Sequence, residues 1–248
     1  MEIEGRTALI TGGAHRVGKA ITLALAGAGA NVVVNYNSSA DAANETVREA
    51  VALGVEGLAV QADVSAYGAV LGMVGAAKDR FGGVDILVNA ASLFKKTPFP
   101  VENISDWQKV TRILIDGAFY CANTVAPRMM ASGRGRIINI VDLSAWQPAP
   151  DYIAHSVGKA ALLAMTRQLA LEMAPIVTVN AVAPGPVLPP PEYTRKQKSE
   201  VASTTLLEKW GTPQDVSDTV LFLARSNYIT GECITVDGGQ QYANSKFG

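Results

Sequence analysis

Short runs of β-branched residues alternate with longer Ala- and Leu-rich stretches along the whole chain, and this alternation restricts the possible folds more than any other feature. Each short run is followed by a helical pattern before the next one begins, which is the order that a parallel sheet with crossover helices requires. The expected strands are residues 7–11, 31–36, 57–63, 85–89, 136–141, 177–184 and 233–239. The expected helices are residues 17–28, 40–53, 66–80, 105–132, 152–173 and 213–224.

The strand runs are almost wholly apolar, as strands buried on both faces are. The pattern therefore predicts an α/β fold with a doubly wound parallel sheet of about seven strands and helices on both faces. A chain of 248 residues is long enough for one such domain, and no linker or repeat divides it.

One segment departs from the alternation. Residues 184–211 are rich in proline and then in charge, and long segments of this kind are usually functional or disordered. The segment leaves the sheet at the carboxyl end of a strand, where open α/β sheets bind their ligands. We therefore expect residues 186–210 to form a lid over a small-molecule substrate.

Composition excludes several classes of function. With 48% hydrophobic and 17% charged residues and a net charge of -1, the chain has no basic face for nucleic acid. It lacks a signal-peptide pattern and any run of about 20 apolar residues, so we expect a cytoplasmic protein with no membrane segment. Cys121 and Cys233 lie in apolar surroundings and are expected to be free thiols. With two histidines in the chain, no metal site is expected.

The stretch TGGAHRVGKA at residues 11–20 follows the first strand and leads into a helix. A glycine turn at a helix N-terminus presents backbone N–H groups and the positive end of the helix dipole to a pyrophosphate. The same glycines would also suit a tight turn alone. The second strand ends in NYNSS at residues 35–39, without a carboxylate for a ribose 2′-hydroxyl. Since His15 and Arg16 favour a 2′-phosphate, we predict NADP rather than NAD.

The chain resembles the short-chain dehydrogenase/reductase family over nearly its whole length. Arg16 replaces the middle glycine of the family's TGxxxGxG loop, as it does in pteridine reductases, to which the chain is most similar. The resemblance implies one NADP-binding Rossmann domain over residues 1–248. The cofactor contacts expected from the motifs and the resemblance are Gly12, His15, Arg16, Val17, Asn35, Tyr36, Asn37, Ser38, Ser39, Asp63, Val64, Asn89, Ala90, Ala91, Ser92, Lys159, Pro184, Gly185 and Val187.

The family's catalytic tetrad is Asn, Ser, Tyr and Lys, and only the lysine is retained. The four positions fall on Leu114, Asp142, His155 and Lys159. Pteridine reductases also carry Asp at the position of Asp142, although an Asp after a strand can simply form a turn. The resemblance implies that Lys159 holds the nicotinamide ribose. The catalytic candidates are therefore Asp142, His155 and Lys159.

His155 and Lys159 lie four residues apart in an expected helix, so they share a face. A neutral imidazole is a weak acid, and a neighbouring ammonium disfavours the imidazolium. His155 is thus either a substitute proton donor or a polar residue that lines the pocket. Tyr152 and a water held by Asp142 are the other candidate donors.

The resemblance places Phe94 where pteridine reductases stack an aromatic ring on the pterin. The substrate contacts predicted on this basis are Arg16, Phe94, Asp142, Tyr152 and His155. Reduction of a C=N bond leaves charge on a basic nitrogen and tolerates the loss of the tyrosine, whereas a ketone needs a good donor at oxygen.

The leading hypothesis is an NADPH-dependent reductase of a pterin-like substrate. One alternative is a reductase of another carbonyl or imine, such as a 3-oxoacyl thioester, and another is a non-catalytic NADP-binding protein. The helical patterns at 105–132 and 152–173 resemble the family's interface helices, which implies a homotetramer or a dimer.

Overall fold

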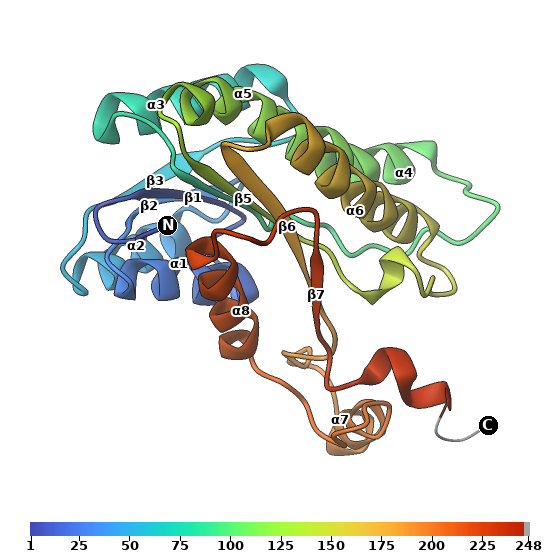
Figure 1. Cartoon of the computed structure of the whole chain (residues 1–248). Coiled ribbons are helices and arrows are strands. Elements are labelled where there is room, and N and C mark those ends of the chain that lie inside the picture. The colour runs from blue at the N-terminus through green and yellow to red at the C-terminus, as the bar shows by residue number, and fades with distance from the viewer. Residues whose placement is uncertain (246–248) are drawn as a thin grey trace.

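A computed structural model describes residues 1–245 and contains one seven-stranded sheet in the order β3-β2-β1-β4-β5-β6-β7 (Figure 1). All neighbouring strands pair in parallel. The strands are β1 (Thr7–Thr11), β2 (Asn31–Tyr36), β3 (Gly57–Gln61), β4 (Ile86–Asn89), β5 (Gly135–Ile140), β6 (Val177–Pro184) and β7 (Cys233–Val236). The strand order reverses between β1 and β4, so this is the point where an open sheet of this type forms a ligand crevice.

Helices cover both faces of the sheet. Figure 1 shows α3, α4, α5 and α6 on one side and α1, α2 and α8 on the other. Their bounds are α1 (Arg16–Gly27), α2 (Ala40–Val51), α3 (Tyr67–Phe81), α4 (Ile104–Thr111), α5 (Ala118–Ala131), α6 (Ile153–Met173), α7 (Arg195–Ala202) and α8 (Pro213–Arg225). The predicted single-domain, doubly wound α/β fold is confirmed. Among the described residues, no helix has the length and apolar character needed to span a membrane.

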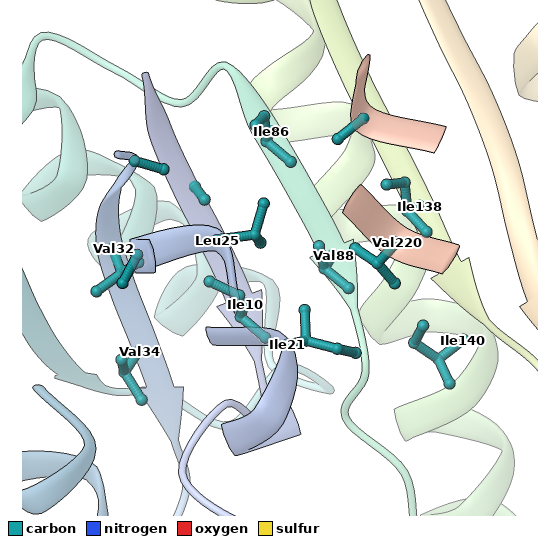
Figure 2. Packing of buried hydrophobic residues seen from close by; sticks show 14 of the residues in the cluster. Ile10, Ile21, Leu25, Val32, Val34, Ile86, Val88, Ile138, Ile140 and Val220 are labelled. Carbon is teal, nitrogen blue, oxygen red and sulfur yellow. The ribbon is translucent and has the colours of Figure 1, made fainter. Parts of the chain in front are cut away.

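The apolar strand runs are explained by the core. Ile10, Val88 and Ile138 are direct neighbours across β1, β4 and β5, and all three are fully or almost fully buried. Ile21 of α1 and Val220 of α8 pack against them from one face (Figure 2). Because a second cluster of buried side chains fills the opposite face, successive residues of a strand are apolar rather than alternating.

The prediction of one continuous α-helix at 105–132 is wrong. A π-helical turn at Arg112–Gly117 separates α4 from α5, and such turns are frequent at functional sites. The smaller differences are at element ends: β3 ends at Gln61, β7 ends at Val236, and α6 begins at Ile153.

The segment expected to be a lid contains a helix that was not predicted. Thr194 caps α7 by accepting a hydrogen bond from the backbone N–H of Gln197, whose side chain accepts one from the backbone N–H of Thr194. This Thr-x-x-Gln capping box is visible in the sequence. The indole of Trp210 donates to the carbonyl oxygen of Lys198 over 2.8 Å, which ties the end of the segment to its own helix.

Candidate active site

A cavity of about 960 Å³ opens at the carboxyl ends of the strands, beside the reversal of strand order. It runs from the glycine turn after β1 to the side chain of Lys159 on α6. Most of the predicted cofactor contacts line it, namely Gly12, His15, Arg16, Val17, Asn35, Tyr36, Asn37, Ser38, Ser39, Ala90, Ser92, Lys159, Pro184 and Gly185.

The glycine turn cannot carry side chains at two positions. Gly12 has a φ of +64°, and a Cβ there would lie 3.0 Å from the Cα of Ala91. A Cβ on Gly18 would lie 2.2 Å from the carbonyl oxygen of Gly12. Glycine at these positions therefore brings the turn close to α1 and to the β4 loop.

The N-terminus of α1 meets the cavity without a capping side chain. His15 occupies the N-cap and makes no side-chain cap hydrogen bond, and the first turn holds no acidic residue. Its first N–H groups and the positive end of the helix dipole can therefore be satisfied by a phosphate. A dinucleotide pyrophosphate fits this geometry.

Arg16 has a φ of +50°, in the left-handed region that favours glycine. Its Nη2 donates to the carbonyl oxygen of Leu188 over 3.0 Å. The side chain thus lies against the proline-rich segment that follows β6. Arg16 lines the cavity but is directed to the predicted lid.

The end of β2 offers no carboxylate to a ribose. Tyr36, Asn37, Ser38 and Ser39 line the cavity there. Asn35 is different, because its side chain is tied into the protein: Oδ1 accepts from the N–H of Gly12, and Nδ2 donates to the carbonyl oxygen of Ala62. Asn35 therefore holds the glycine turn against β2.

Five predicted cofactor residues do not line this cavity: Asp63, Val64, Asn89, Ala91 and Val187. Asp63 accepts hydrogen bonds from the backbone N–H and the hydroxyl of Ser65. Asn89 is buried, and its amide donates to Oδ1 of Asn139 over 2.9 Å. Val64 and Val187 are buried. Asn89, Val64 and Val187 are therefore part of the packed interior, whereas Asp63 is exposed outside the cavity.

Asp142 follows β5 and uses its two carboxylate oxygens differently. Oδ1 caps the short 3₁₀ turn Leu143–Ala145 by accepting from the backbone N–H of Ser144 over 2.9 Å, and it also accepts from the Ser144 hydroxyl. Oδ2 lies 2.7 Å from Nε2 of His155. Asp142 therefore both forms a turn and belongs to a pair of titratable groups.

His155 lies near the start of α6 and is almost completely buried. Nδ1 lies 3.4 Å from the carbonyl oxygen of Leu93, so both ring nitrogens face oxygen atoms that can only accept hydrogen bonds. A doubly protonated ring donates to both, whereas a neutral ring donates to one. The sequence analysis missed this pairing because it considered only the helical neighbour Lys159.

The surroundings keep Asp142 ionised. Burial raises the pKa of its carboxyl group, but the hydrogen bond with His155, the charge of Lys159 and the Ser144 hydroxyl lower it, and the result is a pKa of about 2. Lys159 is fully buried and donates to the carbonyl oxygen of Ile140 over 2.7 Å. Burial lowers the pKa of Lys159, and Asp142 opposes that effect.

Leu114, at the position of the tetrad asparagine, lies in an apolar cluster with Val110 and Ala154. A Cβ on Gly158 would lie 2.6 Å from Cδ1 of Leu114, so the side chain is packed tightly against α6. No side-chain amide is present at this position.

A second cavity, of about 630 Å³, adjoins the first one and shares Phe94, Asp142, Pro184 and Gly185 with it. Its other lining residues are Leu143, Ser144, Gln147, Ala149, Ser203, Thr204, Gln240 and Ala243. It therefore lies between the β5 side of the site and the end of α7.

The aromatic residues near this second cavity form a stack. Phe94 is 65% exposed, and its ring stacks on Tyr152 with centroids 4.2 Å apart and an interplanar angle of 15°. Its centroid is 4.8 Å from that of His155 in an edge-on arrangement. Tyr152 lines neither cavity. One face of Phe94 is therefore already covered.

Comparisons with known proteins identify a family and similar enzymes. A family model described as "Enoyl-(Acyl carrier protein) reductase" matches residues 12–241. A 3-oxoacyl-[acyl-carrier-protein] reductase from Synechocystis sp. is 37% identical over 242 residues, which cover 96% of this chain and 97% of the relative.

Two solved structures are similar over the whole chain. One is a blue fluorescent protein from a metagenomic library in complex with NADPH, with a TM-score of 0.89, 32% identity and coverage of 97% of this chain and 99% of that one. The other is acetoin dehydrogenase from Enterobacter cloacae, with a TM-score of 0.89, 32% identity and coverage of 98% of each chain.

Proposed function

The chain belongs to the short-chain dehydrogenase/reductase family, and from this premise we propose that it is an NADPH-dependent oxidoreductase that interconverts a ketone and a secondary alcohol. A 3-oxoacyl thioester is the leading substrate, because a relative that is 37% identical is a 3-oxoacyl-[acyl-carrier-protein] reductase. This substrate was an alternative in the sequence analysis, and the pterin-like substrate preferred there has no support from the relatives that were found.

The larger cavity suits NADPH, which supplies a hydride when bound. The uncapped N-terminus of α1 would hold the pyrophosphate. Asn37, Ser38 and Ser39 at the end of β2, with His15 of the glycine turn, line the part of the cavity where a 2′-phosphate would lie. Lys159 would hold the nicotinamide ribose. The structural relative in complex with NADPH supports this choice of cofactor.

The pair formed by Asp142 and His155 is the observation that carries the proposal. A carbonyl oxygen that gains negative charge needs a proton donor within reach. The side chain of His155 is 3% exposed and that of Asp142 is 29% exposed, so Asp142 is the member that faces the substrate. The proton that Nε2 and Oδ2 share would pass to the substrate oxygen from the Asp142 side of the pair. In alcohol oxidation a proton would return to the same pair.

Reduction of a C=N bond is a second candidate, because an ionised carboxylate beside the exposed ring of Phe94 suits a protonated imine. Two contacts weaken the case for a pterin. Tyr152 already covers one face of Phe94, and Arg16 is bound to the carbonyl oxygen of Leu188.

The test is NADPH oxidation with an acetoacetyl thioester, dihydrobiopterin and a cyclic imine. Turnover of the thioester is expected. Turnover of only the pterin or the imine would favour the second candidate. Tight binding of NADPH without turnover of any of the three would overturn the proposal in favour of a non-catalytic NADP-binding protein.

A further inference from the structure

The 630 Å³ cavity is polar but holds little charge. Asp142 is the one charged side chain among its lining residues in the described part of the chain. Its other polar residues are Ser144, Gln147, Ser203, Thr204 and Gln240. A ligand there would meet hydroxyl groups, side-chain amides and one carboxylate.

The protons of the hydroxyl groups are used inside the protein. Ser144 donates to Asp142, Ser203 donates to the carbonyl oxygen of Glu200 over 2.8 Å, and Thr204 donates to that of Val201 over 2.7 Å. The hydroxyl oxygens keep free lone pairs, so this part of the wall accepts hydrogen bonds from a ligand.

The two glutamines are oriented in the same sense. The amide nitrogen of Gln147 donates to the carbonyl oxygen of Gln241, and that of Gln240 donates to Oγ1 of Thr204, each over 2.9 Å. These contacts direct the amide nitrogens toward protein acceptors. The amide oxygens remain as further acceptors, and each amide nitrogen keeps one N–H that these contacts do not use.

The nearby cationic side chains do not supply a positive charge to this cavity. Arg16 is bound to the carbonyl oxygen of Leu188, and His15 lies at the glycine turn. Lys159 donates to the carbonyl oxygen of Ile140, His155 lies against Asp142, and neither side chain lines the 630 Å³ cavity. Glu192, which lines the larger cavity, adds a second acidic group from the predicted lid.

We propose that this cavity rejects ketones that carry a carboxylate near the reacting carbon, and that it accepts a neutral or donor-bearing group there, such as a thioester, an amide or an ammonium group. The inference rests on the proposed function, because it assigns the cavity to the group next to the carbonyl. A carboxylate placed there would lie beside the Asp142 carboxylate and beside hydroxyl groups whose protons are already donated, so it would lose hydration without gaining a counterion. Buried charges of this kind discriminate strongly between similar substrates.

The experiment compares acetoacetate with acetoacetamide, which have nearly the same shape, and with aminoacetone, which is cationic. We expect kcat/KM for acetoacetamide to exceed that for acetoacetate by about 10-fold or more, and aminoacetone to be accepted. Calorimetric titration of acetoacetate and acetoacetamide into the complex with NADP tests the same selection without turnover. Equal or tighter binding of acetoacetate would overturn the inference.

Two lysine variants separate local charge from net charge. Ser203→Lys places a cation on the wall of the cavity, and Ala52→Lys places one at the exposed end of α2, which does not line the cavity. The first should reduce the preference for the amide about 5-fold or more, and the second should leave it unchanged.

Turnover of the acetoacetyl thioester is measured in parallel. If the thioester is reduced but acetoacetate binds as well as the amide, the selection is wrong and the proposed function stands. If no ketone is reduced but the amide binds better, the function is wrong and the selection stands.

Discussion

Oδ2 of Asp142 lies 2.7 Å from Nε2 of His155, although the two residues come from different elements and are 13 positions apart. The contact joins the end of β5 to the first turn of α6. It replaces a pair of hydroxyl groups, since the family carries Ser and Tyr at these two positions. The replacement is chemically consistent, because a carboxylate and an imidazole can share a proton as the hydroxyls can share a hydrogen bond.

Asp142→Asn and His155→Gln are expected to have similar effects, because each removes one half of the same pair. Each should lower kcat about 10²-fold. The double variant should be only slightly slower than either single variant, because residues that act as a unit are not additive. The measurements are kcat with an acetoacetyl thioester and NADPH affinity by calorimetry. A loss in the double variant equal to the product of the single losses would show that the two groups act independently.

His155→Tyr alone should not increase ketone reduction. The new hydroxyl would face the ionised carboxylate of Asp142, which would accept its proton in a hydrogen bond and disfavour the phenolate. Asp142→Ser combined with His155→Tyr restores the family pair and should exceed either single variant by about 10-fold or more in kcat. The measurement is kcat for ketone reduction by the two single variants and the double variant. A gain from His155→Tyr alone would show that the effect of residue 155 does not depend on Asp142.

Acid should destabilise the protein partly through Asp142. Its folded pKa of about 2 lies below the usual value of 3.8, so the stabilisation is present above pH 3.8 and is lost as the pH falls toward 2. The full effect is about 2 kcal/mol, of which about 1 kcal/mol is lost between pH 5 and pH 3. Urea unfolding at both pH values compares the wild type with Asp142→Asn, and the wild type should lose more stability. An identical loss in both proteins would refute the assignment.

NADPH should bind more tightly than NADH. Asn37→Asp adds a carboxylate at the end of β2, so it should weaken NADPH binding about 10-fold and improve NADH binding. Asn44→Asp makes the same chemical change on an exposed part of α2 that does not line the cavity, and it should change neither affinity. Both are measured by calorimetric titration. Tighter binding of NADH to the wild type would disprove the cofactor preference.

A homotetramer or dimer remains the expected state in solution. Phe119 of α5 and Val157 of α6 are large apolar side chains that are 46% and 42% exposed, on two helices that lie side by side (Figure 1). Phe119→Asp should lower the mass measured by light scattering, whereas Leu71→Asp on α3 should not. A wild-type mass of 26.0 kDa, that of one chain, would contradict the expectation.

The sequence by itself determined the layered fold and the glycine turn at one end of the cavity. Burial on both faces makes a strand apolar throughout, so the run that contains Ile10 and the run that contains Ile138 were recognisable without any tertiary information. The glycine turn was recognisable because its constraint is local. The carbonyl oxygen of Gly12, six positions earlier, occupies the space that a side chain on Gly18 would need.

Only the tertiary structure decided how the side chains around Asp142 and His155 are arranged. Arg16 turns to Leu188, which is 172 positions away, and Phe94 stacks on Tyr152 from another segment. The hydrogen-bond partner of His155 Nε2 is Asp142, and not the helical neighbour Lys159 that was considered from the sequence. The physical reason is that helical periodicity fixes which residues share a face, whereas the direction of a side chain across a cavity depends on which distant strands and loops pack beside it.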